Sequence, residues 1–209
     1  MPLSLGGLFK PSLKKMAANN DVAGLLAAIK NSRTQGELWD ASHALLSLER
    51  AAARQHLPLL YQALADADAD LRQQAARAIA QYGADAAGVP SLIEALGLPG
   101  FSLDEYLFDA LAALGEQAVQ ALSQAIEHPN QKIKESAVRV LRRLGPSAQP
   151  ALPQLIAALS APEFKRQRWE VVDAIAGCGE PAIAALPQLR QLAQREPEVT
   201  GLKQALRAL

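Results

Sequence analysis

The stretch DADADLRQQAARAIAQYG, residues 66–83, decides the fold of this 209-residue chain. Its apolar residues recur at the three-to-four-residue spacing of a helix face. The acidic residues before them favour a helix N-terminus, and we expect Asp68 or Asp70 to cap it. Gly83, directly after the last apolar residue, is a C-terminal helix signal, because glycine enters left-handed backbone conformations without strain. The stretch predicts a helix over residues 69–82.

The same unit recurs along the chain. Glycines close similar apolar stretches at Gly115, Gly145 and Gly179, at spacings of 32, 30 and 34 residues. A second helical pattern follows each glycine, and an earlier copy fits this frame with Ala51 in the glycine position. A repeat of this length is the signature of a solenoid, in which each unit packs only on its neighbours. The sequence therefore predicts an all-α fold, a right-handed α–α superhelix of about five helix pairs plus capping helices.

The repeat frame also gives the expected element bounds. We expect first helices near residues 35–49, 69–82, 102–114, 130–144 and 162–178, and second helices near 52–64, 85–97, 116–127, 147–160 and 181–194. A short leading helix over about 12–30 and a trailing helix over about 197–208 complete the expected set. We expect one domain over 1–209, with a tail at 1–11, a leading cap at 12–33, five pairs at 34–195 and a C-terminal cap at 196–209.

Equivalent positions in the repeats form ladders of apolar residues, which predict the core. The ladder four residues before each glycine consists of Ile79, Leu111, Leu141 and Ile175. The ladder eight before consists of Ala75, Leu107, Ala137 and Val171, and the ladder one before of Tyr82, Leu114, Leu144 and Cys178. His43 lies eight before Ala51, so we expect a core or semi-core histidine. We likewise expect a buried, unreactive thiol at Cys178.

Composition excludes several classes of protein. Half of the residues are hydrophobic but only 4% are aromatic, and 21 basic residues balance 21 acidic ones. A zero net charge argues against a dedicated nucleic-acid coat. The single cysteine cannot form an internal disulfide, and no apolar run reaches the roughly 18 residues of a membrane span. Residues 1–10 are a poor signal peptide, so we expect a cytoplasmic protein.

Two stretches resemble known repeat proteins. Residues 66–83, quoted above, resemble the HEAT-like repeats of the phycobilisome-lyase type, and LFKPSLKKMAANNDVAGLLAAIKN at 8–31 resembles the leading helices of bacterial HEAT-repeat proteins. The resemblance implies a HEAT-like solenoid. Proteins of this type include scaffolds, chromophore lyases, a metal-dependent hydroxylase and DNA glycosylases, so the fold alone does not assign a function. The His-Glu dipeptides that hold iron in the hydroxylase are absent from this sequence.

Charge is distributed unevenly along the repeats. Residues 64–127 carry 2 basic and 10 acidic residues, whereas residues 128–168 carry 8 basic and 2 acidic residues. Two interpretations remain open: ion pairs between neighbouring repeats, or a basic flank that binds an acidic protein segment or a phosphate-bearing ligand. Trp169 favours the second if it is exposed, because the other repeats carry Gln73, Glu105 and Glu135 in its position. The candidate residues of this flank are Arg142, Arg143, Lys165, Arg166, Arg168 and Trp169.

The second helices supply another candidate surface, the expected concave face. Its polar positions predict partner contacts at Gln62, Glu94, Glu127, Gln154 and Gln188. No continuous basic stripe follows this face, which argues against nucleic acid as the ligand.

The histidines form no recognisable metal triad, and we expect no catalytic residue, metal or cofactor. We therefore expect a non-catalytic, monomeric, bacterial scaffold or adaptor that binds another protein through the concave face or the basic flank. The alternative is a HEAT-like enzyme or enzyme subunit, either chromophore-lyase-like or DNA-glycosylase-like. For the glycosylase, Trp169 with Glu170 and Asp173 would form the site.

Overall fold

The computed structural model of the chain describes residues 12–209, and all regular structure in that range is helical. The expected tail at 1–11 lies outside the described residues. The chain divides into two compact units, residues 1–83 and residues 84–209. The single-domain organisation stays a prediction.

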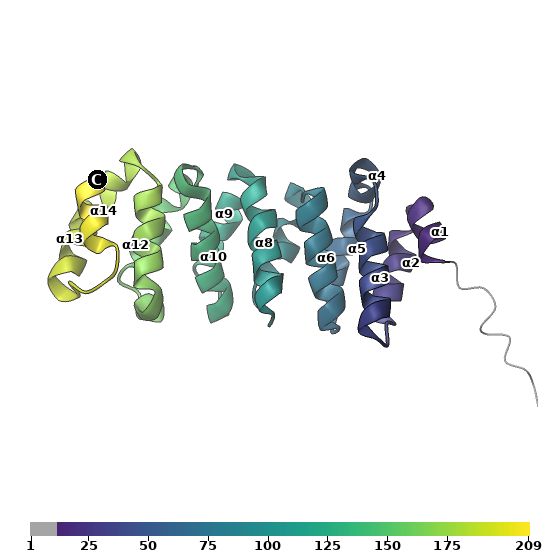
Figure 1. Cartoon of the computed structure of the whole chain (residues 1–209). Helices are drawn as coiled ribbons and strands as arrows, with labels where there is room; N and C mark the ends of the chain where they lie inside the picture. Colours follow the sequence, from purple (N-terminus) through teal and green to yellow (C-terminus); the bar gives the residue numbers. More distant parts are fainter. Residues whose placement is uncertain (1–11) are drawn as a thin grey trace, which may run out of the picture. The chain divides into compact units, whose positions relative to one another are not determined.

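Unit 1 is a small stack of helices. It contains α1 (Leu13–Ala18), α2 (Val22–Lys30), α3 (Gln35–Leu46), α4 (Arg50–Arg54), α5 (Leu57–Ala63) and α6 (Ala69–Tyr82) (Figure 1). Helix α2 packs against α3, and α5 packs against α6. The side chain of Asp68 accepts a hydrogen bond from the N–H of Leu71, which confirms the predicted cap of α6.

Unit 2 is a longer stack with two layers of helices (Figure 1). The first layer contains α8 (Phe101–Leu114), α10 (Gln131–Leu144) and α12 (Arg168–Gly177). The second layer contains α7 (Val89–Ala95), α9 (Glu116–Ala125), α11 (Leu152–Ala158) and α13 (Leu186–Arg195). Short 3₁₀ helices join the layers: η2 (Ala86–Gly88), η3 (Gly145–Ala151), η4 (Pro162–Gln167) and η5 (Glu180–Ala185). Helix α14 (Leu202–Ala208) packs on α12 and α13 as the expected C-terminal cap.

The predicted all-α HEAT-like fold class is confirmed. The predicted second helices are each shorter than expected. A 3₁₀ turn or a break precedes α5, α7, α11 and α13, and proline stands in the first turn of each, whereas α9 begins at Glu116 as expected and ends two residues early, at Ala125. Proline lacks an N–H, which costs little at that position.

The leading cap differs from the single helix expected over residues 12–30. It is itself a short helix pair, α1 and α2, separated by Asn20 with φ of 53°. Asparagine tolerates this left-handed conformation better than most residues, so Asn20 takes the turn position that glycine holds in later repeats. Asp21 then caps α2 by accepting a hydrogen bond from the N–H of Gly24.

The predicted core ladders are buried as expected. All residues four and eight positions before Gly83, Gly115, Gly145 and Gly179 are inaccessible to solvent. Tyr82, Leu114 and Cys178 on the third ladder are also buried, whereas Leu144 is half-buried. Because these residues recur at helical spacing, they lie on one face of each helix, and burial of that face holds the two layers together.

The prediction for His43 is wrong, because this histidine is exposed. In α3 the buried residues are Ala41, Ser42, Ala44 and Leu45, a pattern that matches α6 when 34 residues are added. In this register Glu49 takes the turn position, not Ala51. The expected frame was thus two residues too late, which moved His43 from the outer face onto the core ladder.

Glycines at the turns of unit 2 adopt conformations that other residues enter only with strain. Gly115, Gly145 and Gly179 have φ of 57°, 56° and 75°. We expect Gly145→Ala to lower the free energy of unfolding by about 1–2 kcal/mol. Gly36 in α3 is the control, because a Cβ there meets nothing closer than 3.9 Å. Gly36→Ala should raise stability by about 0.5 kcal/mol in urea unfolding. An equal effect of the two variants would contradict the assignment of strain.

Candidate functional site

The basic residues of α10 pair first with the acidic residues of α8. Lys132 Nζ lies 2.9 Å from Asp104 Oδ1, and the guanidinium of Arg143 pairs with Glu105 and with Asp109. These pairs join neighbouring helices of the first layer of unit 2.

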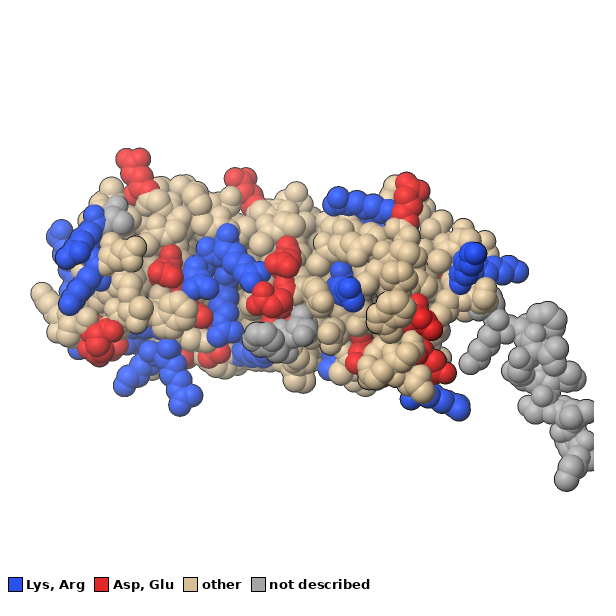
Figure 2. Space-filling view, in the orientation of Figure 1, with Lys and Arg blue, Asp and Glu red and all other residues tan. Residues whose placement is uncertain are grey.

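The other edge of α10 pairs with η4 and α12. Lys134 Nζ lies 2.9 Å from Glu163 Oε1, and Arg139 Nε lies 3.1 Å from Glu170 Oε1. The Glu163 backbone N–H and then Lys134 lower the pKa of the Glu163 carboxyl below its usual value. Figure 2 shows the result, with Lys and Arg side chains over α10 flanked on both sides by acidic ones. The interpretation as ion pairs between neighbouring repeats is confirmed for this part of the flank.

Aromatic rings complete this face of unit 2. The guanidinium carbon of Arg142 lies 5.2 Å from the Trp169 ring centre, and that of Arg143 lies 5.3 Å from the Phe108 ring centre. Both distances are within the range of cation–π attraction. Trp169 is 37% exposed, so it is partly covered by Arg142.

The carboxylates beside Trp169 are also engaged. Glu170 is buried and accepts hydrogen bonds from Arg139 Nε through both oxygens, and Asp173 lies 3.6 Å from Arg142. A shallow hollow of about 330 Å³ opens between α8, α10 and α12, and charged residues line it almost completely. The aromatic, acid-bearing pocket that a glycosylase needs would require Trp169, Glu170 and Asp173 to be free, and here each has a partner.

Arg168 differs from the prediction that it belongs to an exposed basic flank. Only 7% of it is exposed, and its guanidinium bonds to Glu196 and to the Ala161 carbonyl. Arg72 of unit 1 occupies the same repeat position and donates to the carbonyls of Asp66 and Ala67. An arginine at this repeat position holds the loop that precedes its own helix, because the several N–H groups of a guanidinium can donate to more than one loop carbonyl. Its role is therefore structural.

Lys165 and Arg166 are the remaining basic candidates, and both are exposed. Within residues 12–209 neither forms an ion pair. Of the predicted flank, these two side chains and the exposed part of Trp169 are what a ligand could reach without breaking an ion pair.

The second-layer candidates in unit 2 lie on one exposed face, which we call the amide face. It comprises the exposed residues Glu94, Gln124, Glu127, Gln188, Gln191 and Gln194, with half-buried Gln154. None of these glutamine side chains has a hydrogen-bond partner in the described part of the chain, and the Gln154 Oε1 is both buried and unpaired. Glu94 lies 3.6 Å from His128. Gln62, the remaining predicted residue, is exposed in unit 1.

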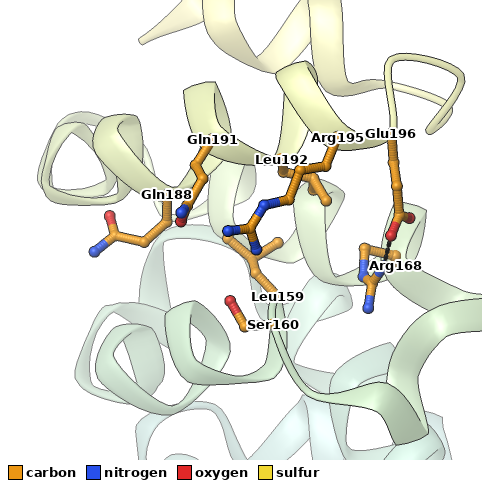
Figure 3. Close-up of a pocket in the computed structure, with 8 residues that line it drawn as sticks. All are labelled: Leu159, Ser160, Arg168, Gln188, Gln191, Leu192, Arg195 and Glu196. Carbon is orange, nitrogen blue, oxygen red and sulfur yellow. Dashed lines mark hydrogen bonds and ion pairs between the residues drawn. The ribbon is translucent and has the colours of Figure 1, made fainter.

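A notch of about 110 Å³ adjoins the amide face between α11 and α13 (Figure 3). Arg195 reaches from α13 across it towards Leu159, while Arg168 turns aside to Glu196. Ser160, Gln188 and Gln191 supply further polar groups. This volume is below the roughly 300–1,000 Å³ of small-molecule sites, so the notch suits a side chain of a larger ligand better than a cofactor.

Cys178 is buried, as predicted, and its Sγ donates to the Ala174 carbonyl at 3.3 Å. Burial raises the pKa of this thiol, which keeps it protonated at neutral pH. We expect a disulfide reagent such as DTNB to modify the folded chain at least about 100-fold more slowly than the chain unfolded in urea, because only the thiolate reacts. Equal rates in the two states would show that the thiol is accessible.

Across residues 12–209 there is no group of three or more His, Cys, Asp or Glu side chains arranged to hold a metal ion. In the same range no helix combines the length and the apolar character needed to cross a membrane.

One exposed residue was missed at the sequence level. Trp39 on α3 is 66% exposed and stacks on His43, with ring centres 5.2 Å apart. The 34-residue register of α3 and α6 could have revealed it, because that register puts Trp39 ten residues before its turn position, as Trp169 is before Gly179.

Comparisons with known proteins add a family match to this geometry. Among solved structures, the chain is similar to an engineered protein (17% identity, TM-score 0.46, 90% of this chain and 95% of that one). It is also similar to human deoxyhypusine hydroxylase in complex with glycerol, at 21% identity and a TM-score of 0.45, over 93% of this chain and 74% of that one. A third similar structure is the CpcE–CpcF complex of phycocyanin lyase from Nostoc sp., at 19% identity and a TM-score of 0.41, over 99% of this chain and 98% of that one. None of the curated proteins matches the chain. Residues 119–209 match the family model of HEAT repeats.

Proposed function

We propose that this protein is a non-catalytic scaffold that holds an extended segment of another protein along the amide face of unit 2. One observation carries the proposal. The exposed glutamines of α9 and α13 recur at equivalent repeat positions, and their amides have no partner within the described residues.

An amide side chain suits a peptide backbone because it offers both a donor and an acceptor. An extended peptide presents N–H and C=O groups along its whole length, and few of them are paired within the peptide. Each hydrogen bond contributes only about 0.5–1.5 kcal/mol net, so several repeats must act together to give useful affinity. A row of amides spread over successive repeats fits that requirement.

Charge gives the amide face a polarity. Exposed Glu94 and Glu127 lie at the α7 and α9 end, whereas exposed Arg190 and Arg195 lie on α13. A bound segment with basic residues at one end and acidic residues at the other would be favoured in one direction. Such complementarity contributes more to specificity and orientation than to affinity.

The basic flank is the weaker candidate surface. Lys132, Arg139 and Arg143 are engaged by acids of α8 and α12, so a ligand would have to displace those carboxylates before it could bind. The ion pairs therefore favour the amide face over the flank.

Affinity capture with quantitative mass spectrometry tests the proposal. We expect Gln124→Ala/Gln188→Ala to reduce capture of wild-type partners by about tenfold, because two hydrogen bonds are lost. Gln204→Ala, an exposed glutamine on α14, is the matched control and should capture normally. Loss only in Arg142→Glu/Arg166→Glu would move binding to the flank and overturn the assignment. Full capture by both double variants would refute a role for either surface.

A further inference from the structure

Trp39 on α3 is an exposed side chain of unit 1 that lies outside the amide face of unit 2. It is the most exposed large hydrophobic side chain in the described residues, at 66%. Its ring is parallel to that of His43 within 2°, so the histidine covers one face of the indole. The rest of the ring meets solvent. Exposing a tryptophan to water is unfavourable, because its large apolar ring stays solvated. Tryptophan is enriched among the residues that contribute most to binding where proteins contact each other.

Comparison of equivalent repeat positions shows that Trp39 lacks the arginine that covers Trp169. Trp169 holds the equivalent position in its own repeat, and it lies beneath Arg142, a residue three before the turn of the preceding repeat. In the leading pair of unit 1 the turn position is Asn20, and the residue three before it is Ala17. Alanine carries no charge. No cation lies over Trp39 among the described residues, although the same position elsewhere in the chain has one.

The helix that carries Trp39 is acidic. Helix α3 contains Glu37 and Asp40, both exposed, and no lysine or arginine, and exposed Arg33 lies just before it. Glu37 is two residues before Trp39, on nearly the opposite side of the helix, and its carboxylate accepts a hydrogen bond from the Arg33 N–H at 2.7 Å, so Asp40 is the acidic neighbour of the indole. Figure 2 shows acidic side chains around the lower ends of α3 and α6. A cation on the indole is therefore attracted both by the carboxylate of Asp40 and by the ring itself.

We propose that Trp39, with Asp40, forms a docking site for a basic segment of a partner protein, which places a Lys or Arg side chain on the indole as Arg142 does on Trp169. This site is on unit 1 and does not depend on the amide face of unit 2. Exposed cation–π contacts are modest individually, so the carboxylate of Asp40 is needed for useful binding.

Fluorescence anisotropy of labelled probe peptides tests the site. The probe is a short peptide of alternating glycine and arginine, and the control is the same peptide with glutamate. We expect the full-length protein to bind only the arginine peptide, and binding to weaken as salt rises. Trp39→Leu should weaken binding at least about threefold, and Asp40→Asn should weaken it as well.

Matched variants separate the site from general effects. Ile183→Ala removes another exposed hydrophobic side chain, and Trp169→Phe changes the tryptophan that already carries Arg142, so both should bind as the wild type does. Circular dichroism checks that each variant is folded. Unchanged binding by Trp39→Leu, or equal binding of the glutamate peptide, would overturn the proposal. So would a wild-type dimer, detected by sedimentation, that Trp39→Leu converts to monomer, because a second copy would then occupy the surface.

Discussion

Leu141→Ala is expected to lower the free energy of unfolding of unit 2 by about 4 kcal/mol. Leu141 is inaccessible to solvent and lies in α10, between α8 and α12. Removing buried methyl groups loses transfer free energy and leaves a cavity, which costs about 2–5 kcal/mol for Leu→Ala. This is a large part of the 5–15 kcal/mol typical of a folded domain, so a partly unfolded population at room temperature is a further expected sign.

Urea unfolding followed by Trp169 fluorescence measures this loss in unit 2, and Trp39→Phe in the background removes the signal from unit 1. Ile183→Ala is the control, because Ile183 is 47% exposed and should change stability by less than about 1 kcal/mol. A cost below about 1 kcal/mol for Leu141→Ala would mean that α10 is not the centre of the core.

Arg139→Met is expected to destabilise unit 2 by about 3 kcal/mol. Glu170 is only 5% exposed, and both of its oxygens accept from Arg139 Nε. Removing one partner of a buried pair leaves the other charge without compensation, which costs about 3–5 kcal/mol. Because Arg139 is half-exposed and water can reach its end of the pair, the lower end of that range applies.

The companion variant Arg139→Met/Glu170→Leu should recover most of the loss, since an apolar pair of similar volume is often as stable as a buried ion pair. Urea unfolding of the two single variants and the double variant gives the coupling energy. Additive losses in this cycle would indicate that Arg139 acts through packing alone and that Glu170 does not depend on it.

The core could be predicted from sequence because helical spacing alone decides which residues share a face. Leu111, Leu141 and Ile175 needed no knowledge of neighbouring helices. The register failed in α3, where no glycine marks the turn. Ala51 looked acceptable there, but the buried pattern of Ala41 and Leu45 shows that the turn position is Glu49.

The candidate site was harder to predict because charge pairing depends on which edge of a helix faces which neighbour. Arg142 and Arg168 were both predicted as members of the basic flank. Arg142 lies over the partly exposed indole of Trp169, whereas Arg168 is buried against Glu196. Gln188 was predicted as a partner contact from its repeat position alone, and it is exposed with no hydrogen-bond partner for its amide among the described residues. The exposed stack of Trp39 on His43 was hidden by the two-residue error in register.

The alternating charges of the first layer also restrict which repeats can be neighbours. Helix α8 presents Asp104 and Asp109 to α10, and α12 presents Glu170 and Asp173 from the other side. If a folding chain skipped α10 and docked α8 on α12, acid would meet acid, and like charges brought together cost several kcal/mol. Misassembly of similar units is a characteristic failure of repeat proteins. The basic charges of α10 therefore favour the order α8, α10, α12 in unit 2 over an order in which α8 packs directly on α12.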